Sequence, residues 1–440
     1  MPRSLAREVA KITWPMLISE ISESVYSIVD TFFVSFLGTE ALAAVGASSY
    51  LSWLFFVIIA LFSTGLLVVV SQSYGAGEVN KARKALGEAI IVGVLVTTAI
   101  SIAVYFFAPF LLRMLLGNNP EVVKIALSYF SIRILGLPLQ LIAMSMDSTL
   151  RAVGATRYSM IAVIASTASN TMLDPILILG LYGLPKLGVR GAALATILAI
   201  TLMIPIELFF LDKTGILPIL GTFSKPLLVT RIFSIGLPAA LERAIFALGN
   251  NVYIGLIARC GEEALAAHHI GVRIESFIYM PGFAFSIAAA SLVGQKIGAG
   301  NVGEAKKVGW EATKLAVIIM TVMGISIAVM SHYLVKPFAP EHSVAVLAST
   351  YLILAGLSET GLALAMTISG SIRGGGNTLV PMLINAAGLY LFRIVPATLL
   401  VPIYGAVGAW IAMFVDVYMR GLILSIMYSM FFEKLAKKIV

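Results

Sequence analysis

The sequence predicts an all-α, multi-pass membrane protein with twelve transmembrane helices, arranged as two parallel, pseudo-symmetric six-helix bundles around a central cleft. Three observations predict this class: the apolar composition, the number of long apolar segments and an internal repeat. Of the 440 residues, 59% are hydrophobic and 12% are charged, whereas soluble domains carry about 25% charged residues. The mean hydropathy is +0.99, so we expect no soluble domain in the chain.

Long apolar segments follow one another along the whole chain. Runs of about 20 residues or more, bounded by Gly, Pro or charged residues, are typical of membrane-spanning helices. We expect twelve of them, at approximately 12–37, 45–73, 85–112, 122–149, 157–180, 189–211, 229–258, 264–293, 309–335, 344–370, 378–401 and 404–430.

Lysine and arginine are unevenly distributed over the loops between these segments. An even number of spans places both termini on one side, and the loops of that side carry most of the basic residues. Because basic loops stay in the cytoplasm, we expect a plasma-membrane protein with both termini cytoplasmic. The net charge of +8 is explained by this orientation, and no nucleic-acid partner is expected.

An internal repeat relates the two halves of the chain. The segment Gly38–Ala44 returns as Gly261–Ala267, a shift of 223 (261 − 38), and Pro15 returns as Pro238 at the same shift. Six helices per half is an even number, so the two bundles are parallel and face each other across a cleft. We expect an N-terminal lobe at 1–212, a cytoplasmic linker at 213–226 and a C-terminal lobe at 227–440. Glycine and proline discourage a helix in that linker, at Gly215, Pro218, Gly221 and Pro226.

The first apolar segment carries three acidic residues, Glu20, Glu23 and Asp30. At 100° per residue they share one helix face within roughly 80° of arc, with Ser27 beside them. A carboxylate at membrane depth costs about 2.5–3.5 kcal/mol, so this face indicates a polar cavity. The alternative is that the acids pair with arginines of other helices and only hold the bundle together.

A second polar face occurs on the fifth segment, where Asn170 and Asp174 are four residues apart. Counting at 1.5 Å per residue places Asp30, Asp174 and Thr196 roughly 10 Å inside the outer boundary. We therefore expect Asp30, Asn170, Asp174 and Thr196 to form an all-oxygen site, which suits Na⁺ or a shared proton. The alternative is a polar cluster that fixes helix packing.

Further polar residues of the apolar segments are candidates for contact with a substrate in the cleft. The acids of the first half are not repeated, since Asp30 maps to Tyr253 at the shift of 223. Pairing with in-membrane arginines such as Arg243 is the alternative for the acids of the second half. The cleft candidates are Glu20, Glu23, Tyr26, Ser27, Glu242, Asn250, Glu275 and Glu359.

Several functional classes find no support in the motifs. Cys260 is the single cysteine, and the adjacent His268 and His269 do not share a helix face, so no resident metal site is expected. The glycine runs lack a following Gly-Lys-Ser/Thr, so no ATPase motor is encoded. We expect neither an enzyme nor a cofactor beyond a coupling ion, H⁺ or Na⁺, and we expect a monomer.

The order and repetition of short motifs resemble the multidrug and toxic compound extrusion (MATE) transporters. The motifs are Val29-Asp30-Thr31, Gly38, Ala41–Ala44, Gly75-Ala76-Gly77, Leu173-Asp174-Pro175 and the Arg-x-x-Gly-x-Thr segments at 151–156 and 373–378. The spacings from Pro15 to Asp30 and from Asn170 to Asp174 are similar to the prokaryotic branch, whose cation site lies in the N-terminal lobe.

The resemblance implies H⁺ or Na⁺ binding at Asp30, Asn170, Asp174 and Thr196, and a helix bend at Pro15. Other branches place an essential acid on the seventh helix, to which Glu242 would correspond. Glu20 and Glu23 lie outside the family pattern.

The leading hypothesis is a secondary antiporter that exports organic, mostly cationic or amphipathic compounds in exchange for H⁺ or Na⁺. A lipid-linked saccharide or lipid flippase of the same superfamily is the alternative. It would use arginines in the helices, which are Arg133, Arg243, Arg273, Arg393 and Arg420. An intramembrane transferase would need an aspartate-rich Mg²⁺ motif, which the sequence lacks.

Overall fold

The structure is a computed structural model that describes residues 2–117, 119–225, 227–339 and 341–439. Its described residues form helices and short connections, and no strand occurs among them. The long helices are α1 (Pro2–Ser35), α2 (Thr39–Gly75), α3 (Val79–Leu116), α4 (Pro120–Leu135), α5 (Leu137–Ala152), α6 (Thr156–Leu179), α7 (Val189–Lys213), α8 (Leu228–Ala258), α9 (Glu262–Gly298), α10 (Val302–Val335), α11 (His342–Gly374), α12 (Leu379–Gly388), α13 (Val395–Tyr404) and α14 (Ala406–Leu435). A short 3-10 helix, Leu181–Gly183, follows α6, and a π-helical turn, Leu389–Ile394, joins α12 to α13.

The all-helical, multi-pass class is confirmed, and the length and hydropathy of the described helices account for eleven of the twelve expected spans. Within the described ranges, ten segments can cross a membrane alone, with α12 and α13 counted as one of them, and α4 with α5 forms an eleventh. Helix α1 is the twelfth expected span. It is less apolar than the ten helices that can cross a membrane alone, because acidic and hydroxyl side chains interrupt its apolar residues.

The fourth span is not the continuous helix expected at 122–149, because α4 and α5 meet at Gly136 with a bend of 47°. Pro138 lies in the first turn of α5 and cannot donate a backbone hydrogen bond to α4. A Cβ atom at Gly136 would lie 2.6 Å from Cδ1 of Ile197, so a larger residue here would require the Ile197 side chain of α7 to shift.

The chain divides into two compact units, Ile18–Gly236 and the remainder, Met1–Leu17 with Leu237–Val440. The divisions fall inside α1 and α8, close to Pro15 and Pro238, the two prolines that the repeat relates. The predicted lobe limits, 1–212 and 227–440, stay a prediction. The first half of α1 groups with the C-terminal unit, where Val9, Ile12 and Met16 pack against buried side chains of α9 and α10.

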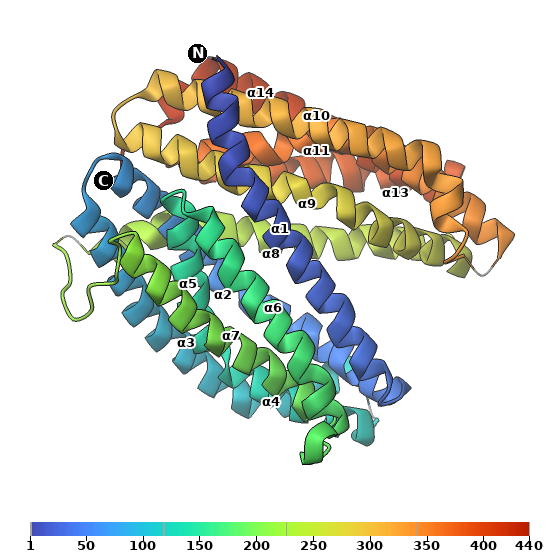
Figure 1. Cartoon of the computed structure of the whole chain (residues 1–440). Helices are drawn as coiled ribbons and strands as arrows, with labels where there is room; N and C mark the ends of the chain where they lie inside the picture. The colour runs from blue at the N-terminus through green and yellow to red at the C-terminus, as the bar shows by residue number, and fades with distance from the viewer. Residues whose placement is uncertain (1, 118, 226, 340, 440) are drawn as a thin grey trace. The chain divides into compact units, whose positions relative to one another are not determined.

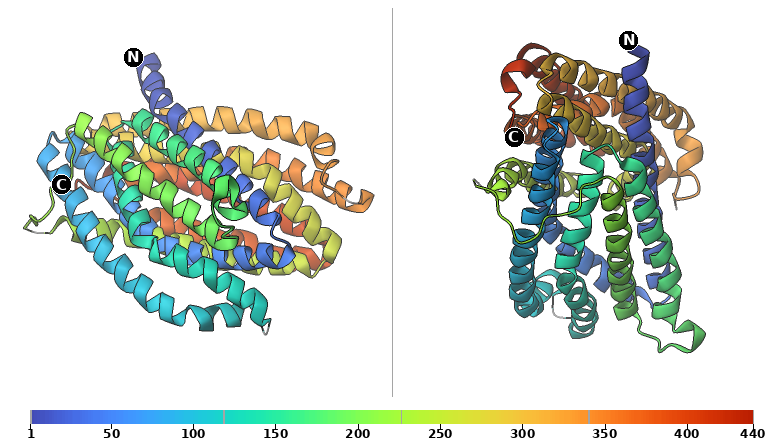
Figure 2. Two further views of the ribbon diagram at one scale, coloured as in Figure 1. Left: turned by 60° about the horizontal axis from the view of Figure 1, so that its bottom comes forward. Right: turned by 60° about the vertical axis from the view of Figure 1, so that its left-hand side comes forward.

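In the unit Ile18–Gly236, α6 packs along α7, and both appear in green in Figure 1. Of the linker expected at 213–226, Lys213 still belongs to α7, whereas residues 214–225 are non-helical, and Figure 2 shows them beside α3. Arg83 of α3 donates from Nε to the Leu217 carbonyl at 3.0 Å. Buried Glu88 accepts from the amides of Ser224 and Val229 at 2.6 and 3.0 Å, which fixes the start of α8. Pro226 of the linker lies outside the described residues.

In the other unit, α9, α10, α11 and α14 pack against one another. Tyr253, Tyr351 and Trp410 are among the largest fully buried side chains of its core. Gly324 of α10 and Gly356 of α11 face each other so closely that a Cβ at Gly324 would lie 2.2 Å from the Gly356 carbonyl oxygen. Small residues thus allow α10 and α11 to pack backbone against backbone.

Candidate cation site

The four residues predicted to form the cation site lie on α1, α6 and α7 of the unit Ile18–Gly236. Asn170 and Asp174 are one turn apart on α6, and both are buried. With the Asn170 amide nitrogen turned toward Asp174, it donates to Oδ2 at 3.0 Å, and the amide oxygen accepts from the Thr196 backbone N–H at 3.2 Å. The Thr196 hydroxyl lies 2.9 Å from the Tyr26 hydroxyl of α1. The structure therefore links Asn170, Asp174 and Thr196, and joins them to α1 through Tyr26.

Asp30 completes this group from α1. It acts electrostatically on Asp174, as expected for two neighbouring carboxylates. One buried oxygen of each, Oδ1, has no hydrogen-bond partner among the described residues. A buried carboxylate oxygen without a partner is costly. Two interacting carboxylates that each have such an oxygen are therefore suited to bind a proton or a small cation.

Arg133 of α4 is part of the same cluster, which the sequence analysis did not foresee. Its charge acts on Asp30, Tyr26 and Tyr129. The sequence did mark Arg133 as one of the arginines within helices, but only the packing of α4 shows which acid it faces. With both carboxylates ionised, the cluster carries a formal charge of −1 (1 − 2), which one monovalent cation neutralises.

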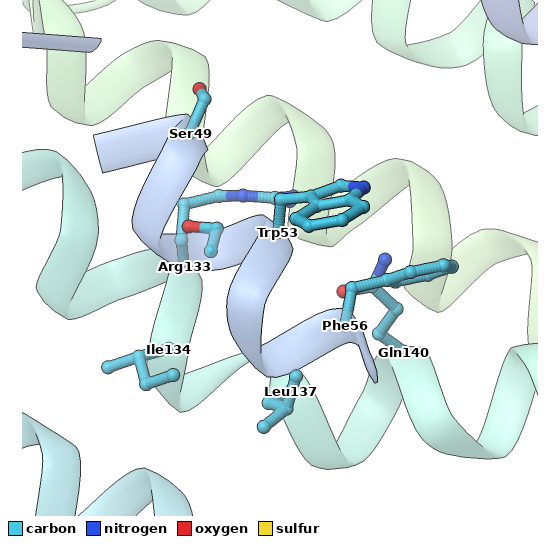
Figure 3. A pocket seen from close by; sticks show the side chains of 8 residues that line it. Ser49, Trp53, Phe56, Arg133, Ile134, Leu137 and Gln140 are labelled. Atoms are coloured by element: carbon cyan, nitrogen blue, oxygen red, sulfur yellow. The ribbon is translucent and has the colours of Figure 1, made fainter. Parts of the chain in front are cut away.

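Arg133 also lines a pocket of about 180 Å³ between α2 and the bent α4–α5 pair. Figure 3 shows side chains of all three helices at this pocket. Its lining residues are Ser49, Ser52, Trp53, Phe56, Arg133, Ile134, Leu137 and Gln140. The bend at Gly136 brings residues of both α4 and α5 to the pocket.

The remaining acids of α1 lie toward the other end of the bundle. Glu20 is 3.5 Å from Nη1 of Arg151, which also binds Asp147. The arginine-pairing alternative thus holds for Glu20, but its partner belongs to the repeated Arg-x-x-Gly-x-Thr segment and sits in the last turn of α5. Glu23 interacts electrostatically with the same group, whereas Ser27 is exposed.

Of the three acids predicted for the cleft in the second half, two bind described residues of their own unit and the third does not. Glu242 receives hydrogen bonds from Nη2 of Arg373 and Nδ2 of Asn385, each at 2.7 Å. Glu275 accepts a hydrogen bond from the Tyr351 hydroxyl. Glu359 is fully buried, and neither of its carboxylate oxygens has a partner among the described residues.

Asn250 of the same set is exposed. A role of these residues in a substrate cleft stays a prediction, as does the hinge at Pro15.

Two of the arginines that the flippase alternative needs share one buried acid. Asp416 of α14 is buried and binds Arg393 at 2.9 Å, and it binds Arg420 through both carboxylate oxygens at 2.6 and 2.7 Å. Both arginines are therefore held by an acid of their own unit, and the three groups together carry a formal charge of +1 (2 − 1).

Comparison with known proteins shows a match between this sequence and a protein family. The family model MatE matches residues 15–176 and again 238–399. A probable multidrug resistance protein NorM of Thermotoga maritima is 28% identical over 95% of this chain and 90% of its own. An FAD transporter of Shewanella oneidensis is 25% identical, over 95% of this chain and 93% of its own.

Solved structures share the fold. The Vibrio cholerae MATE transporter VcmN in its bent form aligns with a TM-score of 0.92 at 24% identity, covering 99% of this chain and 98% of its own. A MOP superfamily transporter from Pyrococcus furiosus, described by the reverse polarity of its binding pocket, aligns with a TM-score of 0.90 at 21% identity. That alignment covers 98% of this chain and 97% of its own.

Proposed function

Because the chain belongs to the MatE family, we propose that it is a secondary active multidrug exporter driven by the entry of H⁺ or Na⁺. The observation that carries this proposal is the pair Asp30 and Asp174, whose carboxylates interact and each keep one buried oxygen that no described residue binds. Relatives named as multidrug resistance proteins support export of organic compounds. Those compounds are expected to be mostly cationic or amphipathic small molecules.

The proposed cycle follows from the charge of the site. Without a bound cation, the two carboxylates of α1 and α6 repel each other, and a bound cation draws α1 toward α6 and α7. If the cation favours one arrangement of α1 and the substrate favours the other, each must weaken the binding of the other, typically by about 1–3 kcal/mol. The chain acts in this proposal as a monomer in the plasma membrane, with both termini in the cytoplasm.

The test uses proteoliposomes that contain the purified protein. Uptake of a fluorescent organic cation is measured under a pH gradient alone and under a Na⁺ gradient alone. Asp30→Asn and Asp174→Asn should each abolish gradient-driven uptake, because they remove a carboxylate from the site. Glu40→Gln, at an exposed acid on α2, is the matched control and should transport normally.

Comparing uptake under the two gradients identifies the coupling ion. FAD should be tested as a second substrate, because one relative is an FAD transporter. Gradient-driven uptake that survives in Asp30→Asn would remove the site from the proposal. Movement of fluorescent lipid without uptake of any soluble compound would support the flippase instead.

A further inference from the structure

A second group of carboxylates lies in the unit Ile18–Gly236, at the opposite end of α7 from Thr196. Glu207 is six residues before the end of α7 at Lys213, and eleven residues after Thr196. At 1.5 Å per residue these intervals are about 9 Å and about 16 Å. Glu207 and the residues around it are therefore separate from the Asp30–Asp174 site.

Asp147 and Arg151 of α5 form the fixed part of this group. Nε of Arg151 binds Oδ2 of Asp147 at 2.6 Å, and the Ser159 hydroxyl of α6 donates to Oδ1 of the same carboxylate. Arg151 also lies 3.3 Å from the Ser159 hydroxyl and 3.5 Å from Glu20. Both oxygens of Asp147 therefore have partners, and one guanidinium is shared between two carboxylates.

Glu207 differs from Asp147 in having no such partner. Its side chain is 0% exposed, and neither carboxylate oxygen makes a hydrogen bond to any described residue. The charged groups that act on it are Asp147 and Arg151. A fully buried carboxylate in this position needs a proton or a cation as its partner.

The charges that surround Glu207 add to this need. Glu20 and Glu23 of α1 also act on the charge of Arg151. Together with Asp147 and Glu207, four carboxylates therefore act on one guanidinium. The formal charge is −3 (1 − 4) if all are ionised. Of the other helices that pack against α7, α6 contributes the Ser159 hydroxyl, whereas α4 directs its Arg133 to the Asp30 site.

The burial of Glu207 indicates which ligand it takes. An organic cation needs space beside the carboxylate, which a fully buried side chain does not offer. A metal ion needs several ligands at one point, and no group of three acidic, histidine or cysteine side chains suited to a metal ion occurs in the described part of the chain. A proton needs neither space nor further ligands.

We propose that Glu207 is a second proton-binding site, which releases its proton when Arg151 moves from Asp147 to Glu207. The proton passes between the Glu207 carboxyl group and water on the side of the membrane where α5 ends and α7 ends. Arg151 can take part in this exchange because it lies in the last turn of α5 and both Asp147 and Glu207 act on its charge. The proposal rests on the proposed transport function for its role in a cycle, but proton binding itself can be measured without transport.

The test is infrared difference spectroscopy of the purified full-length protein during pH steps. The wild type should show the carbonyl band of a protonated carboxylic acid that disappears as pH rises. Glu207→Gln should lack this band, whereas Asp212→Asn, at an exposed acid on the same helix, should retain it. Glu207→Asp keeps a carboxyl group and should show a shifted band, which separates loss of the proton site from loss of folding.

Three results would overturn the inference. They are a band unchanged in Glu207→Gln, no pH-dependent band assignable to residue 207, and loss of the band on adding Na⁺ at constant pH. In proteoliposomes, Glu207→Gln should flatten the pH dependence of uptake. If the transport proposal is wrong, the wild type will show no gradient-driven uptake, whereas the infrared bands will be unaffected.

Discussion

Arg373 donates from Nη2 to both carboxylate oxygens of Glu242 at 2.7 Å. The repeat-related arginine of the first half, Arg151, lies 3.5 Å from Glu20. Each arginine ends a helix of its own half, and each reaches the helix that opens that half, α8 or α1. The repeated Arg-x-x-Gly-x-Thr segment thus holds an acidic residue in both halves, although the acids are not at equivalent repeat positions.

Removing Arg373 should destabilise the protein strongly. Arg373→Gln leaves Glu242, whose side chain is 9% exposed, without its cationic partner. Breaking a buried ion pair from one side costs about 3–5 kcal/mol. Thermal unfolding in detergent should show a clear fall in Tm. The double variant Arg373→Gln/Glu242→Gln should recover much of the loss, and a double variant as unstable as the single one would contradict the ion-pair explanation.

Arg133 should weaken cation binding at the Asp30 site, because its positive charge acts on Asp30. Arg133→Gln removes this repulsion, so gradient-driven uptake should reach half of its maximum at a lower concentration of the coupling cation. The measurement is uptake into proteoliposomes over a series of cation concentrations. Arg113→Gln changes an exposed arginine at the end of α3 and is the control. An increase in the required concentration would contradict this prediction and would show that Arg133 is needed to hold the site together.

Pro15 and Pro238 are expected to let α1 and α8 bend where the compact units divide. A proline inside a helix removes one backbone hydrogen bond and crowds the preceding turn. Pro15→Ala and Pro238→Ala should restore that bond, slow amide hydrogen exchange in the flanking turns and reduce the transport rate. Pro175→Ala, within α6 of one unit, tests whether loss of any helical proline has this effect. Equal transport defects in all three variants would argue against hinges.

Cys260, in the loop between α8 and α9, offers a test of membrane orientation. Burial raises the pKa of its thiol, so little reactive thiolate is present near neutral pH. Labelling by a membrane-impermeant maleimide should be slow near pH 7 and faster as pH rises toward the raised pKa. With cytoplasmic termini, this loop faces outward and intact cells should label. Since Cys260 is the single cysteine, Cys260→Ser is the blank, and labelling only after permeabilisation would reverse the orientation.

The residues of the candidate cation site were predictable because each is a polar residue within an apolar segment, at a position that helical periodicity fixes. Asn170 and Asp174 are one turn apart, and Asp30 and Thr196 lie at a similar depth on other helices. Their surroundings were not predictable in the same way. Arg133 was visible as a charged residue in an apolar segment, but its position beside Asp30 depends on how α4 packs against α1.

Glu207 was harder to find from sequence. It lies near the end of an apolar segment, where an acid is commonly assigned to the membrane surface, and Asp147 likewise lies one turn before the basic Arg151 of a turn motif. The signal that could have identified both is the acidic residue in an otherwise apolar helix. Only the packing of α5, α6 and α7 shows that both oxygens of Asp147 have hydrogen-bond partners, whereas no described residue binds the oxygens of Glu207.

The sequence by itself determined the membrane class, the twelve helical segments, the repeat and the polar faces of α1 and α6. These properties depend on hydropathy and on helical periodicity, which act over neighbouring residues. The tertiary structure alone decided the bend at Gly136, the partners of Asp147 and Glu242, and the burial of Glu207 where no described residue binds it. Those features depend on how helices rotate and pack against each other, and residues far apart in the chain meet only through that packing.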